Sequence, residues 1–486
     1  MLLTTEGTYP YHSGGVSTWC DNLIKGLPEV DFTLMPIMMH PYISVKYEVP
    51  PNVSKVVNVP LWGTEEPAEY ILDIPFSHVY LAKQRTTPGV IAGDFLPGFR
   101  ELVRLIYAEL TDAWRVGEIL YGMYRYFRTF DYNTTFKSKL VWEAFGEAVL
   151  AQGAAGEDGD QPSLFELTEA LRWLYRFLIP LNADPPRVDL THSTAAAFCG
   201  LPCVVAKLRD RTPFLLTEHG VYIREQYLSV SRMKTSAAAK AFLLNLIVTI
   251  ARVNYEFADQ ISPVCHYNKR WELAHGAPEH KLKVIHNGVD PELFTPGESS
   301  GDERLVVSAA RIDPLKDLET LLRAARRVTD AEPDIRFVVY GGVSDPDYHQ
   351  RCLALRADLG LETSFQFQGH SRSPWEAYNQ GAVVALSSIS EAFPYSVIEA
   401  MACGRAVVAS DVGGVREALE GSGLLVRPRD PEALGAAILA LLRDRDMRAQ
   451  MGQDARDRVL NDFTMARFVA AYRESYAALA AAGVGA

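Results

Sequence analysis

The first part of the chain alternates between short apolar runs and a stretch with helical spacing. Residues 1–5 form an apolar run. After a turn, apolar positions recur on one face of a helix at Val16, Trp19, Cys20, Leu23, Ile24 and Leu27. Further apolar runs that end in polar residues occur at 188–192 and 214–220. We predict strands at the three runs and a helix over residues 16–27.

Beyond residue 300 the alternation is more regular. Strands are expected at residues 305–310, 335–340, 383–386 and 406–410, and helices at 318–328 and 396–402. Short apolar strands separated by helices indicate parallel βαβ units with both sheet faces covered. The pattern predicts an α/β protein with two Rossmann-like, doubly wound domains. In such domains ligands bind beyond the carboxyl ends of the strands.

Two segments interrupt this alternation. Residues from about 95 to 180 are rich in Tyr, Phe, Trp and Leu at helical spacing, which predicts a helical insertion. The small and acidic residues 151–160 inside it predict a loop, and a hinge is expected at 284–291. The predicted organisation is an N-terminal domain over residues 1–292, a C-terminal domain over 293–464 and a helix over 465–486 that returns to the N-terminal domain.

Composition narrows the class of protein. The chain has 486 residues, 48% of them hydrophobic and 22% charged, as in a globular protein of two or three domains. The formal net charge is −12, and binding to nucleic-acid backbones needs a basic surface. We therefore expect no nucleic-acid partner, and an anionic ligand would need a local cluster of basic groups.

The cysteines and the N-terminal residues indicate the cellular compartment of the protein. None of the six cysteines has paired zinc-ligand spacing, and they suggest small buried residues in a reducing compartment: Cys20, Cys199, Cys203, Cys265, Cys352 and Cys403. The N-terminus lacks a basic region followed by an apolar core, so no signal peptide is predicted. The apolar residues 241–251 are too few for a membrane span, which needs about 20. We expect a buried or interface-lying helix there and a cytoplasmic protein.

Two basic residues mark the first candidate site. Arg311 directly follows the expected strand 305–310, and Lys316 lies in the same loop before the next helix. A guanidinium can make a forked contact and an ammonium supplies a point charge, which together suit a diphosphate.

Two glutamates flank the helix expected at 396–402. Glu391 lies in the loop before it, and Glu399 lies about one turn inside it. The free amides at the start of a helix attract anions, whereas carboxylates accept hydrogen bonds from neutral hydroxyls. This order of groups suits a nucleotide linked to a sugar.

These residues resemble a known family. The spacing Arg311-x4-Lys316 with Glu391-x7-Glu399 resembles the signature of the retaining family 4 glycosyltransferases, which have the GT-B fold. Residues 286–290 and 400–414 are also typical of that family. Residues 5–19 and 217–220 resemble a narrower group, the PelF-like bacterial exopolysaccharide glycosyltransferases. The resemblance covers both halves and is weak over about residues 60 to 180.

The resemblance implies two Rossmann-like domains that face a central cleft, with the acceptor on the N-terminal side and a nucleotide-sugar donor, UDP-linked, on the other. Arg311 and Lys316 would neutralise the diphosphate, Glu399 would accept from the ribose, and Glu391 would hold the sugar. The catalytic residues implied are His219, Arg311, Lys316 and Glu391. The remaining donor-binding residues implied are Gly14, Gly15, Ala392, Phe393, Pro394, Tyr395, Ser396, Val397 and Glu399, and the acceptor side would include His192 and Glu218.

The resemblance also implies the chemistry. No triad of nucleophile, base and orienting group emerges, and in retaining GT-B enzymes the departing phosphate takes the acceptor proton on the same face. We expect neither a metal nor a cofactor. Three Asp-x-Asp strings, which begin at Asp158, Asp345 and Asp444, suggest solvated surface.

Other functions remain open. A GT-B sugar-nucleotide epimerase would need acid–base residues at the sugar ring. A non-catalytic nucleotide-sugar sensor in a membrane polysaccharide-export complex would bind the donor without turnover, and such a complex would place the protein at the inner face of the membrane. A glycogen synthase is disfavoured because its Lys-x-Gly-Gly loop has His12 at the lysine position here.

Overall fold

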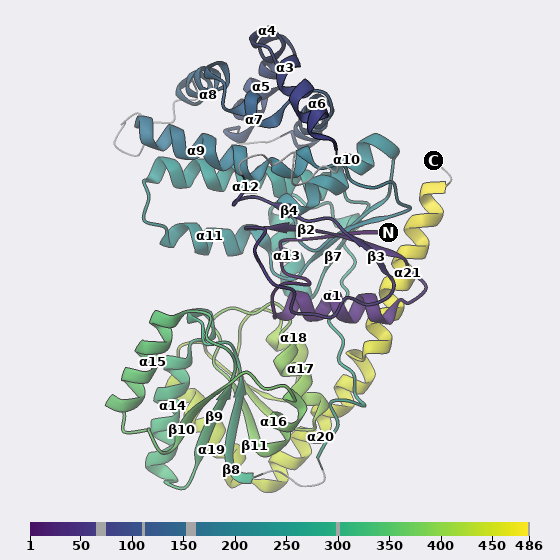
Figure 1. The fold of residues 1–486 in the computed structure, drawn as a ribbon. Coiled ribbons are helices and arrows are strands. Elements are labelled where there is room, and N and C mark those ends of the chain that lie inside the picture. Colours follow the sequence, from purple (N-terminus) through teal and green to yellow (C-terminus); the bar gives the residue numbers. More distant parts are fainter. Residues whose placement is uncertain (65–73, 109–111, 152–161, 298–301, 485–486) are drawn as a thin grey trace. The chain divides into compact units, whose positions relative to one another are not determined.

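The structure is a computed structural model that describes residues 1–64, 74–108, 112–151, 162–297 and 302–484 (Figure 1). The chain forms two compact units. The first contains Met1–Pro263, Lys269–Val284 and Arg473–Ala486, and the second contains Val264–Asn268 and Ile285–Tyr472. The contacts of the chain thus assign residues 285–292 to the second unit, whereas the predicted boundary lay after residue 292.

The described strands of the first unit form a parallel sheet. Their order is β3-β2-β1-β5-β6-β7, with β4 also paired to β2. The bounds are β1 (Leu2–Thr5), β2 (Phe32–Met38), β3 (Val53–Val56), β4 (Val59–Pro60), β5 (Thr191–Ser193), β6 (Phe214–Glu218) and β7 (Gln260–Pro263). The order reverses at β1, which makes this a doubly wound sheet.

Helix α1 (Gly15–Gly26) packs on this sheet as its sequence predicts. Trp19, Cys20, Leu23 and Ile24, which repeat at helical spacing, are fully buried. The strands expected at residues 1–5 and 214–220 are confirmed as β1 and β6. The strand expected at 188–192 is shorter and later, because only Thr191–Ser193 pair with both β1 and β6.

The region between β4 and β5 is helical and begins earlier than residue 95. Phenylalanine and tyrosine rings supply its core. For example, the ring centroid of Phe95 lies 5.2–5.7 Å from those of four other rings, Phe99, Tyr126, Phe127 and Phe136. From residue 152 on, the expected loop 151–160 lies outside the described residues. The helices are α3 (Phe76–Arg85), α4 (Pro88–Val90), α5 (Leu96–Ile106), α6 (Ala113–Phe127), α7 (Tyr132–Phe136), α8 (Lys139–Ala151) and α9 (Leu164–Phe177), with a π-helical turn at Ile91–Phe95.

Helix α12 (Ala237–Phe257) contains the apolar run 241–251 and is longer than that run. Among the described helices it is the one that could cross a membrane by length and composition. Phe242, Leu246 and Ile250 lie in the core of the first unit, and 56% of the most apolar stretch is buried. The structure thus uses this helix as a core element, as expected for a buried helix.

The described strands of the second unit also form a parallel sheet, in the order β10-β9-β8-β11-β12-β13. The expected strands and helices of this half are confirmed to within a few residues. The strands are β8 (Asp302–Ala309), β9 (Arg336–Tyr340), β10 (Phe365–Gly369), β11 (Gly381–Leu386), β12 (Ala406–Ser410) and β13 (Leu424–Val426). The helices are α14 (Leu318–Ala331), α15 (Pro346–Asp358), α16 (Pro374–Gln380), α17 (Tyr395–Ala402), α18 (Val415–Leu419), α19 (Pro431–Arg443) and α20 (Arg445–Asp462).

The last helix, α21 (Met465–Val484), joins the first unit from Arg473 onward. There Arg473 pairs with Glu29 at 2.7 Å, and Ser475 accepts a hydrogen bond from Gln260 at 3.0 Å. The C-terminal segment therefore contributes polar contacts to a unit that is built mainly from the first half of the chain.

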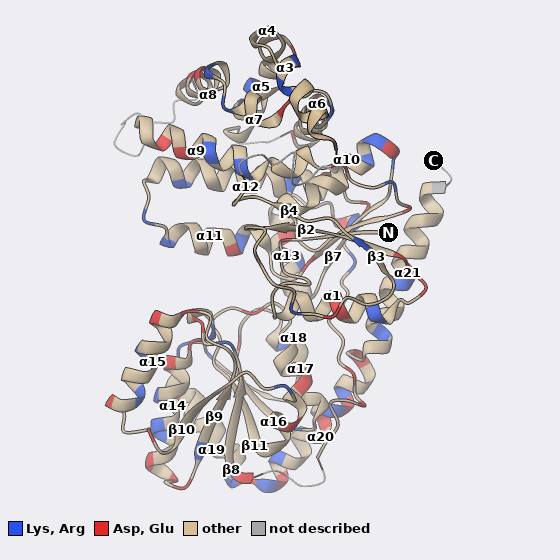
Figure 2. Ribbon diagram, in the orientation of Figure 1, with Lys and Arg blue, Asp and Glu red and all other residues tan. Residues whose placement is uncertain are grey.

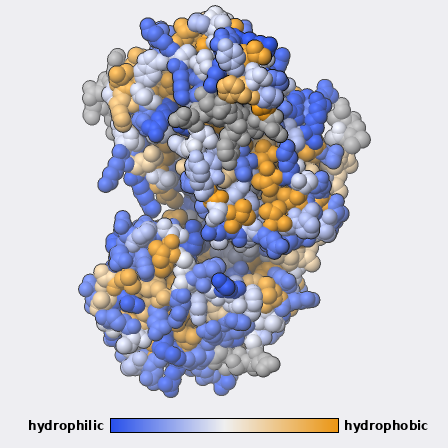
Figure 3. Space-filling view, in the orientation of Figure 1, coloured by the Kyte–Doolittle hydropathy of each residue, from blue (hydrophilic) through white to orange (hydrophobic). Residues whose placement is uncertain are grey.

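The surface carries mixed charge. Figure 2 shows acidic and basic residues interspersed along the helices of each unit. On the face drawn in Figure 3, hydrophilic residues predominate and hydrophobic ones are scattered between them. The net charge of −12 thus reflects an excess of acidic over basic residues that are mixed along both units.

Two carboxyl groups are buried together in the first unit. Glu218 at the end of β6 and Glu272 in α13 (His266–Ala274) are both fully buried and interact with each other. The hydroxyl of Tyr255 donates to Glu218 at 2.7 Å. Burial raises the pKa of both carboxyl groups, and the charge of Glu218 further raises that of Glu272.

This pair predicts a pH dependence of stability. An acid whose pKa is higher in the folded state binds protons more tightly there, so the free energy of unfolding falls as pH rises above the unfolded value of about 4.3. Glu272→Gln removes one of the two ionisations and keeps a hydrogen-bonding group. We expect the variant to match wild type near pH 4 and to be more stable by roughly 1–3 kcal/mol at pH 8.

The measurement is urea unfolding of both proteins across this pH range. The control is Glu279→Gln, which changes an exposed glutamate of the same unit and should leave the pH profile unchanged. A difference between Glu272→Gln and wild type that does not grow with pH would contradict the assignment.

Candidate active site

The site forms where the strand order of the second unit reverses. β8 and β11 are neighbours, with Val307 beside Val384, so the loops that follow them leave the same edge of the sheet. The first loop carries Arg311 and Lys316, and the second carries Glu391 before α17. The topology therefore brings together the residues that the sequence predicts for the donor. Ligands of doubly wound sheets bind at such a reversal of strand order.

The two loops are hydrogen-bonded to each other. Nζ of Lys316 lies 2.5 Å from Oε1 of Glu391, which also accepts from Oγ of Ser388 at 2.6 Å. The Lys316 and Glu391 side chains are only 18% and 9% exposed. The backbone carbonyl of Lys316 accepts from the hydroxyl of Ser387 at 2.8 Å. An ammonium has three N–H donors, so Lys316 can keep Glu391 and still bind an anion.

Arg311 is available to a ligand. It follows Ala310 at the end of β8 and is exposed. Within the part of the chain that the structure describes, its guanidinium has no hydrogen bond or ion pair. The forked N–H groups are thus not used by the fold, as expected for a residue that recognises a phosphate.

Helix α17 starts at the same edge. Its N-cap is Pro394, whose side chain makes no capping hydrogen bond. Phe393 and Pro394 are buried, whereas Ala392, Tyr395 and Ser396 are half-buried, and Val397 packs in the core. The first-turn amides of a helix and its dipole favour negative charge at this end.

Glu399 lies in the second turn of α17. The hydroxyl of Tyr378 in α16 donates to its Oε2 at 2.8 Å. Burial raises the pKa of Glu399 to about 7, and the hydrogen bond from Tyr378 opposes that shift. A carboxylate has about four lone-pair positions, so Glu399 can accept further hydrogen bonds from hydroxyl groups of a ligand.

Sequence reasoning missed the glycines that make room for the Glu391 loop. A Cβ on Gly413 would lie 1.6 Å from the carbonyl oxygen of Glu391, and one on Gly414 would lie 2.3 Å from that of Ala392. Gly413 also has φ +58°, which favours glycine. Asn287 holds the same loop through a 2.8 Å hydrogen bond from Nδ2 to the Phe393 carbonyl. A Gly-Gly pair just after an expected strand was the signal available for this support.

A second glycine pair supports the Arg311 loop. A Cβ on Gly341 would lie 1.9 Å from the Ala310 carbonyl oxygen, so the end of β9 packs directly on the end of β8. Ile312 donates its N–H to the Gly342 carbonyl at 2.9 Å. Neither glycine was among the predicted site residues, and neither was Tyr378, Ser387 or Ser388.

The N-terminal site residues lie in the first unit. Gly14 is the N-cap of α1, and both Gly14 and Gly15 are exposed. A Cβ on Gly14 would have nothing within 4 Å. The described residues therefore leave open space beside Gly14, and the predicted contact of Gly14 and Gly15 with a phosphate stays a prediction.

His219 follows β6 and is half-buried. The ring of Trp19 lies edge-on at a centroid distance of 4.7 Å. Burial lowers the pKa of His219 to about 3, so its imidazole is neutral at physiological pH. A neutral imidazole could not act as a cationic group toward a sugar. The catalytic role of His219 stays a prediction, in which the orientation of its ring or its backbone carbonyl would stabilise positive charge that develops on the sugar.

His192 and Glu218 are used inside the first unit. Both side chains are fully buried. The ring nitrogens of His192 are hydrogen-bonded to the hydroxyls of Tyr476 at 2.7 Å and Thr217 at 2.8 Å. Glu218 accepts from the hydroxyl of Tyr255 and from the N–H of Tyr222 at the start of α11 (Tyr222–Arg232). The expectation that these side chains line the acceptor side has no support from their positions.

Two of the three Asp-x-Asp strings begin at helix caps. The carboxylates of Asp345 and Asp444 accept from the N–H groups of Tyr348 and Met447, each at 2.8 Å. Asp345 is half-buried and Asp347, Asp444 and Asp446 are exposed, so the expectation of solvated surface is confirmed for all of these but Asp345. The string at Asp158 lies outside the described residues.

Models of two protein families match the two halves of the chain. A domain of unknown function, DUF3492, matches residues 1–280, and the glycosyl transferases group 1 domain matches residues 289–458. The chain is 29% identical over 271 residues to a D-inositol 3-phosphate glycosyltransferase of Corynebacterium glutamicum (strain R), covering 51% of this chain and 63% of that one. It is 33% identical over 232 residues to the protein of that name from Kribbella flavida, covering 43% and 54%. The chain therefore spans between half and two thirds of the length of these relatives.

Solved structures show the same fold. The Anabaena protein HepE in complex with UDP and glucose superposes with a TM-score of 0.61 at 14% identity, covering 98% of this chain and 99% of HepE. Sucrose-phosphate synthase from Thermosynechococcus elongatus superposes with a TM-score of 0.62 at 18% identity, covering 99% of both chains. The two parallel-sheet, Rossmann-like units thus have the GT-B fold. The chain belongs to the DUF3492 family and carries a glycosyl transferases group 1 domain in its second half.

Proposed function

We propose that the protein is a glycosyltransferase that moves a sugar from a nucleotide diphosphate donor, UDP-linked, to a saccharide acceptor. The observation that carries the proposal is the convergence of Arg311, Lys316 and the N-terminus of α17 at one edge of the second sheet. Two cations and a helix N-terminus can hold a diphosphate, and the carboxylates of Glu391 and Glu399 can accept from sugar and ribose hydroxyls.

The comparisons support this proposal at a coarser level. The second half matches a glycosyl transferases group 1 domain, and the curated relatives are named as glycosyltransferases. HepE, which shares the fold, has been solved with UDP and with UDP-glucose. UDP is therefore the nucleotide we propose for this chain.

The proposed reaction retains the configuration of the donor sugar and needs no metal. The bond from the sugar C1 to the diphosphate oxygen breaks, and a bond from C1 to the acceptor oxygen forms on the same face. The acceptor proton passes to the departing diphosphate. Arg311, Lys316 and the α17 amides would stabilise the charge that develops on this leaving group. Retention and metal independence rest on the resemblance to family 4.

The physiological role we propose is synthesis of an exopolysaccharide in the cytoplasm, at the inner face of the membrane with an export complex. This part rests on the PelF-like sequences at residues 5–19 and 217–220. A thermal-shift panel of UDP-, GDP- and ADP-sugars tests the donor, because a ligand that binds the folded state raises apparent stability. Stabilisation by GDP- or ADP-sugars alone would overturn the choice of UDP.

Loss of the cations should weaken nucleotide binding. Arg311→Ala removes a guanidinium that the fold does not use, so a folding defect is not expected. A charge-assisted hydrogen bond contributes about 1.5–3 kcal/mol, or roughly 10- to 100-fold in Kd for UDP. Calorimetric titration with UDP measures this effect.

Lys316→Ala should have a similar effect on UDP but also leaves Glu391 without its partner, so its stability must be measured alongside. Arg323→Ala is the matched control, since Arg323 is an exposed arginine of α14 in the same unit. Unchanged UDP affinity in both Arg311→Ala and Lys316→Ala would remove the two residues from the donor site.

Changes at Glu399 and Glu391 should affect the binding of different parts of the donor. Glu399→Gln should weaken UDP and the UDP-sugar alike, because the carboxylate is assigned to the ribose. Glu391→Gln should spare UDP while it lowers turnover and the discrimination between sugar epimers. At about pH 8 or above, where Glu399 is also ionised, both changes remove one negative charge, so a general charge effect cannot separate them. Equal loss of UDP binding in both variants would show that the assignment along α17 is wrong.

Chelation should leave turnover largely intact. In the proposed site cations and amides neutralise the diphosphate, and Asp345 and Asp444 are engaged as helix caps. Assay of donor turnover before and after treatment with EDTA measures the effect. Complete loss that manganese or magnesium restores would establish a catalytic metal instead.

A further inference from the structure

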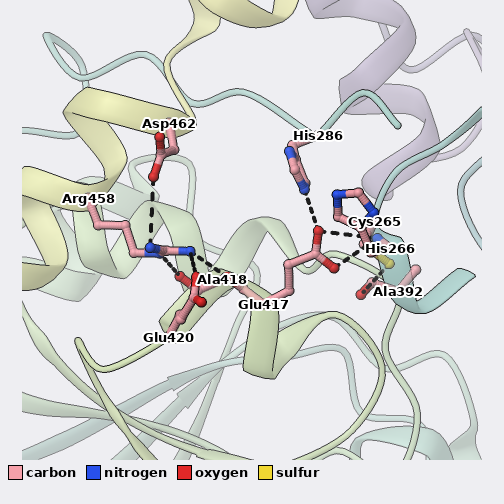
Figure 4. Close-up of polar contacts among 9 residues, drawn as sticks. All are labelled: Cys265, His266, His286, Ala392, Glu417, Ala418, Glu420, Arg458 and Asp462. Carbon is pink, nitrogen blue, oxygen red and sulfur yellow. Dashed lines mark hydrogen bonds and ion pairs between the residues drawn. The ribbon is translucent and has the colours of Figure 1, made fainter. Parts of the chain in front are cut away.

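Three possible metal ligands meet in the second unit, outside the donor site. They are His266 at the start of α13, His286 just after the chain enters the second unit at Ile285, and Glu417 in α18. One ligand atom from each lies within 4.8 Å of the other two. Figure 4 shows the imidazole of His286 directed at the Glu417 carboxylate, with His266 beside the same carboxylate.

The Glu417 carboxylate is held in place on both sides. Oε1 lies 2.6 Å from Nε2 of His286, and Oε2 accepts from the backbone N–H of His266 at 2.8 Å. Arg458 of α20 donates to the backbone carbonyls of Glu417 and Ala418, each at 2.9 Å (Figure 4). The end of α18 is therefore fixed and cannot easily turn Glu417 away from the histidines.

The His286 ring is fixed by aromatic packing. Its centroid lies 4.9 Å from that of Phe393 and 5.3 Å from that of Phe463. His286 and Glu417 are half-buried, whereas His266 is exposed. The cluster thus combines two oriented ligands with an exposed third one, which leaves a path for an ion to enter.

The chemistry of the cluster suits a cation, because one carboxylate and two imidazoles each offer a ligand atom to the same place. The ring centroids of His266 and His286 lie 6.1 Å apart, so the two imidazoles can approach one ion from different sides.

We propose that His266, His286 and Glu417 bind one divalent cation of the zinc class. Imidazole and carboxylate together suit zinc, whereas magnesium and calcium prefer sites made of oxygen ligands. Zinc–nitrogen distances of about 2.0–2.1 Å in a tetrahedral site place ligand atoms about 3.3 Å apart. The farthest pair must therefore close by about 1.5 Å from its present limit of 4.8 Å.

The ion would join three separate segments of the second unit. His266 belongs to the short segment Val264–Asn268, which is separated along the chain from the rest of this unit. Glu417 lies three residues after Gly414, whose backbone packs on Ala392 of the donor loop. Zinc would thus connect residues 264–268 to α18, the helix that begins directly after Gly414. Its binding would stabilise the folded form.

The test uses the full-length protein freed of metal by chelation and then dialysed. Calorimetric titration with zinc chloride should show saturable binding of one ion per chain, and the thermal midpoint should rise with zinc but not with magnesium. His266→Ala changes an exposed residue and should fold normally, and it should weaken zinc binding by at least about 10-fold. His286→Gln and Glu417→Gln should weaken it as well.

His280→Gln, which changes an exposed histidine of the first unit, is the matched control and should bind zinc like wild type. UDP binding measured in every variant separates this proposal from the proposed enzymatic function, since the zinc ligands do not include the donor residues. Absence of saturable zinc binding, or wild-type affinity in both His266→Ala and His286→Gln, would overturn the proposal.

Discussion

The close approach of three strand-end loops in the second unit is the constraint on which the candidate site depends. The loop after β12 can touch the loop after β11 only because Gly413 and Gly414 lack a Cβ, which would overlap the carbonyl oxygens of Glu391 and Ala392. The loop after β8 is joined to the loop after β11 through Lys316 and Glu391. These contacts set the position of α17 and so direct its N-terminus toward the same edge as Arg311.

The pairing of Lys316 with Glu391 changes how the site is understood. Family resemblance assigns the lysine to the diphosphate and the glutamate to the sugar, as separate contacts. In the structure the two side chains form one partly buried unit, which a ligand must share or rearrange. A partly buried pair that loses one member leaves an uncompensated charge, so each residue also supports the geometry of the other. Arg311, by contrast, is a cation whose contacts are left to a ligand.

The first unit shows how burial changes the meaning of polar residues at strand ends. Glu218 ends β6 and His219 follows it, where functional residues are expected, whereas His192 is the middle residue of β5. Two of them are completely enclosed, and their polar atoms are satisfied by Thr217, Tyr222, Tyr255 and Tyr476. Tyr476 comes from the last helix, 284 residues away from His192 along the chain. A buried histidine with two hydroxyl partners stabilises its surroundings whether or not it serves a ligand.

The sequence alone determined the α/β class, the two doubly wound units, the strand-end loops that carry Arg311, Lys316 and Glu391, and the helix that carries Glu399. It could do so because local periodicity decides strands and helices, and because parallel strands place their carboxyl ends on one edge. Only the tertiary structure decided which of these residues pair and that His192 and Glu218 are enclosed. It also decided that His266, His286 and Glu417 meet. Each of these outcomes depends on contacts between residues distant in sequence or on the burial of a side chain, and neither has a local periodic signal.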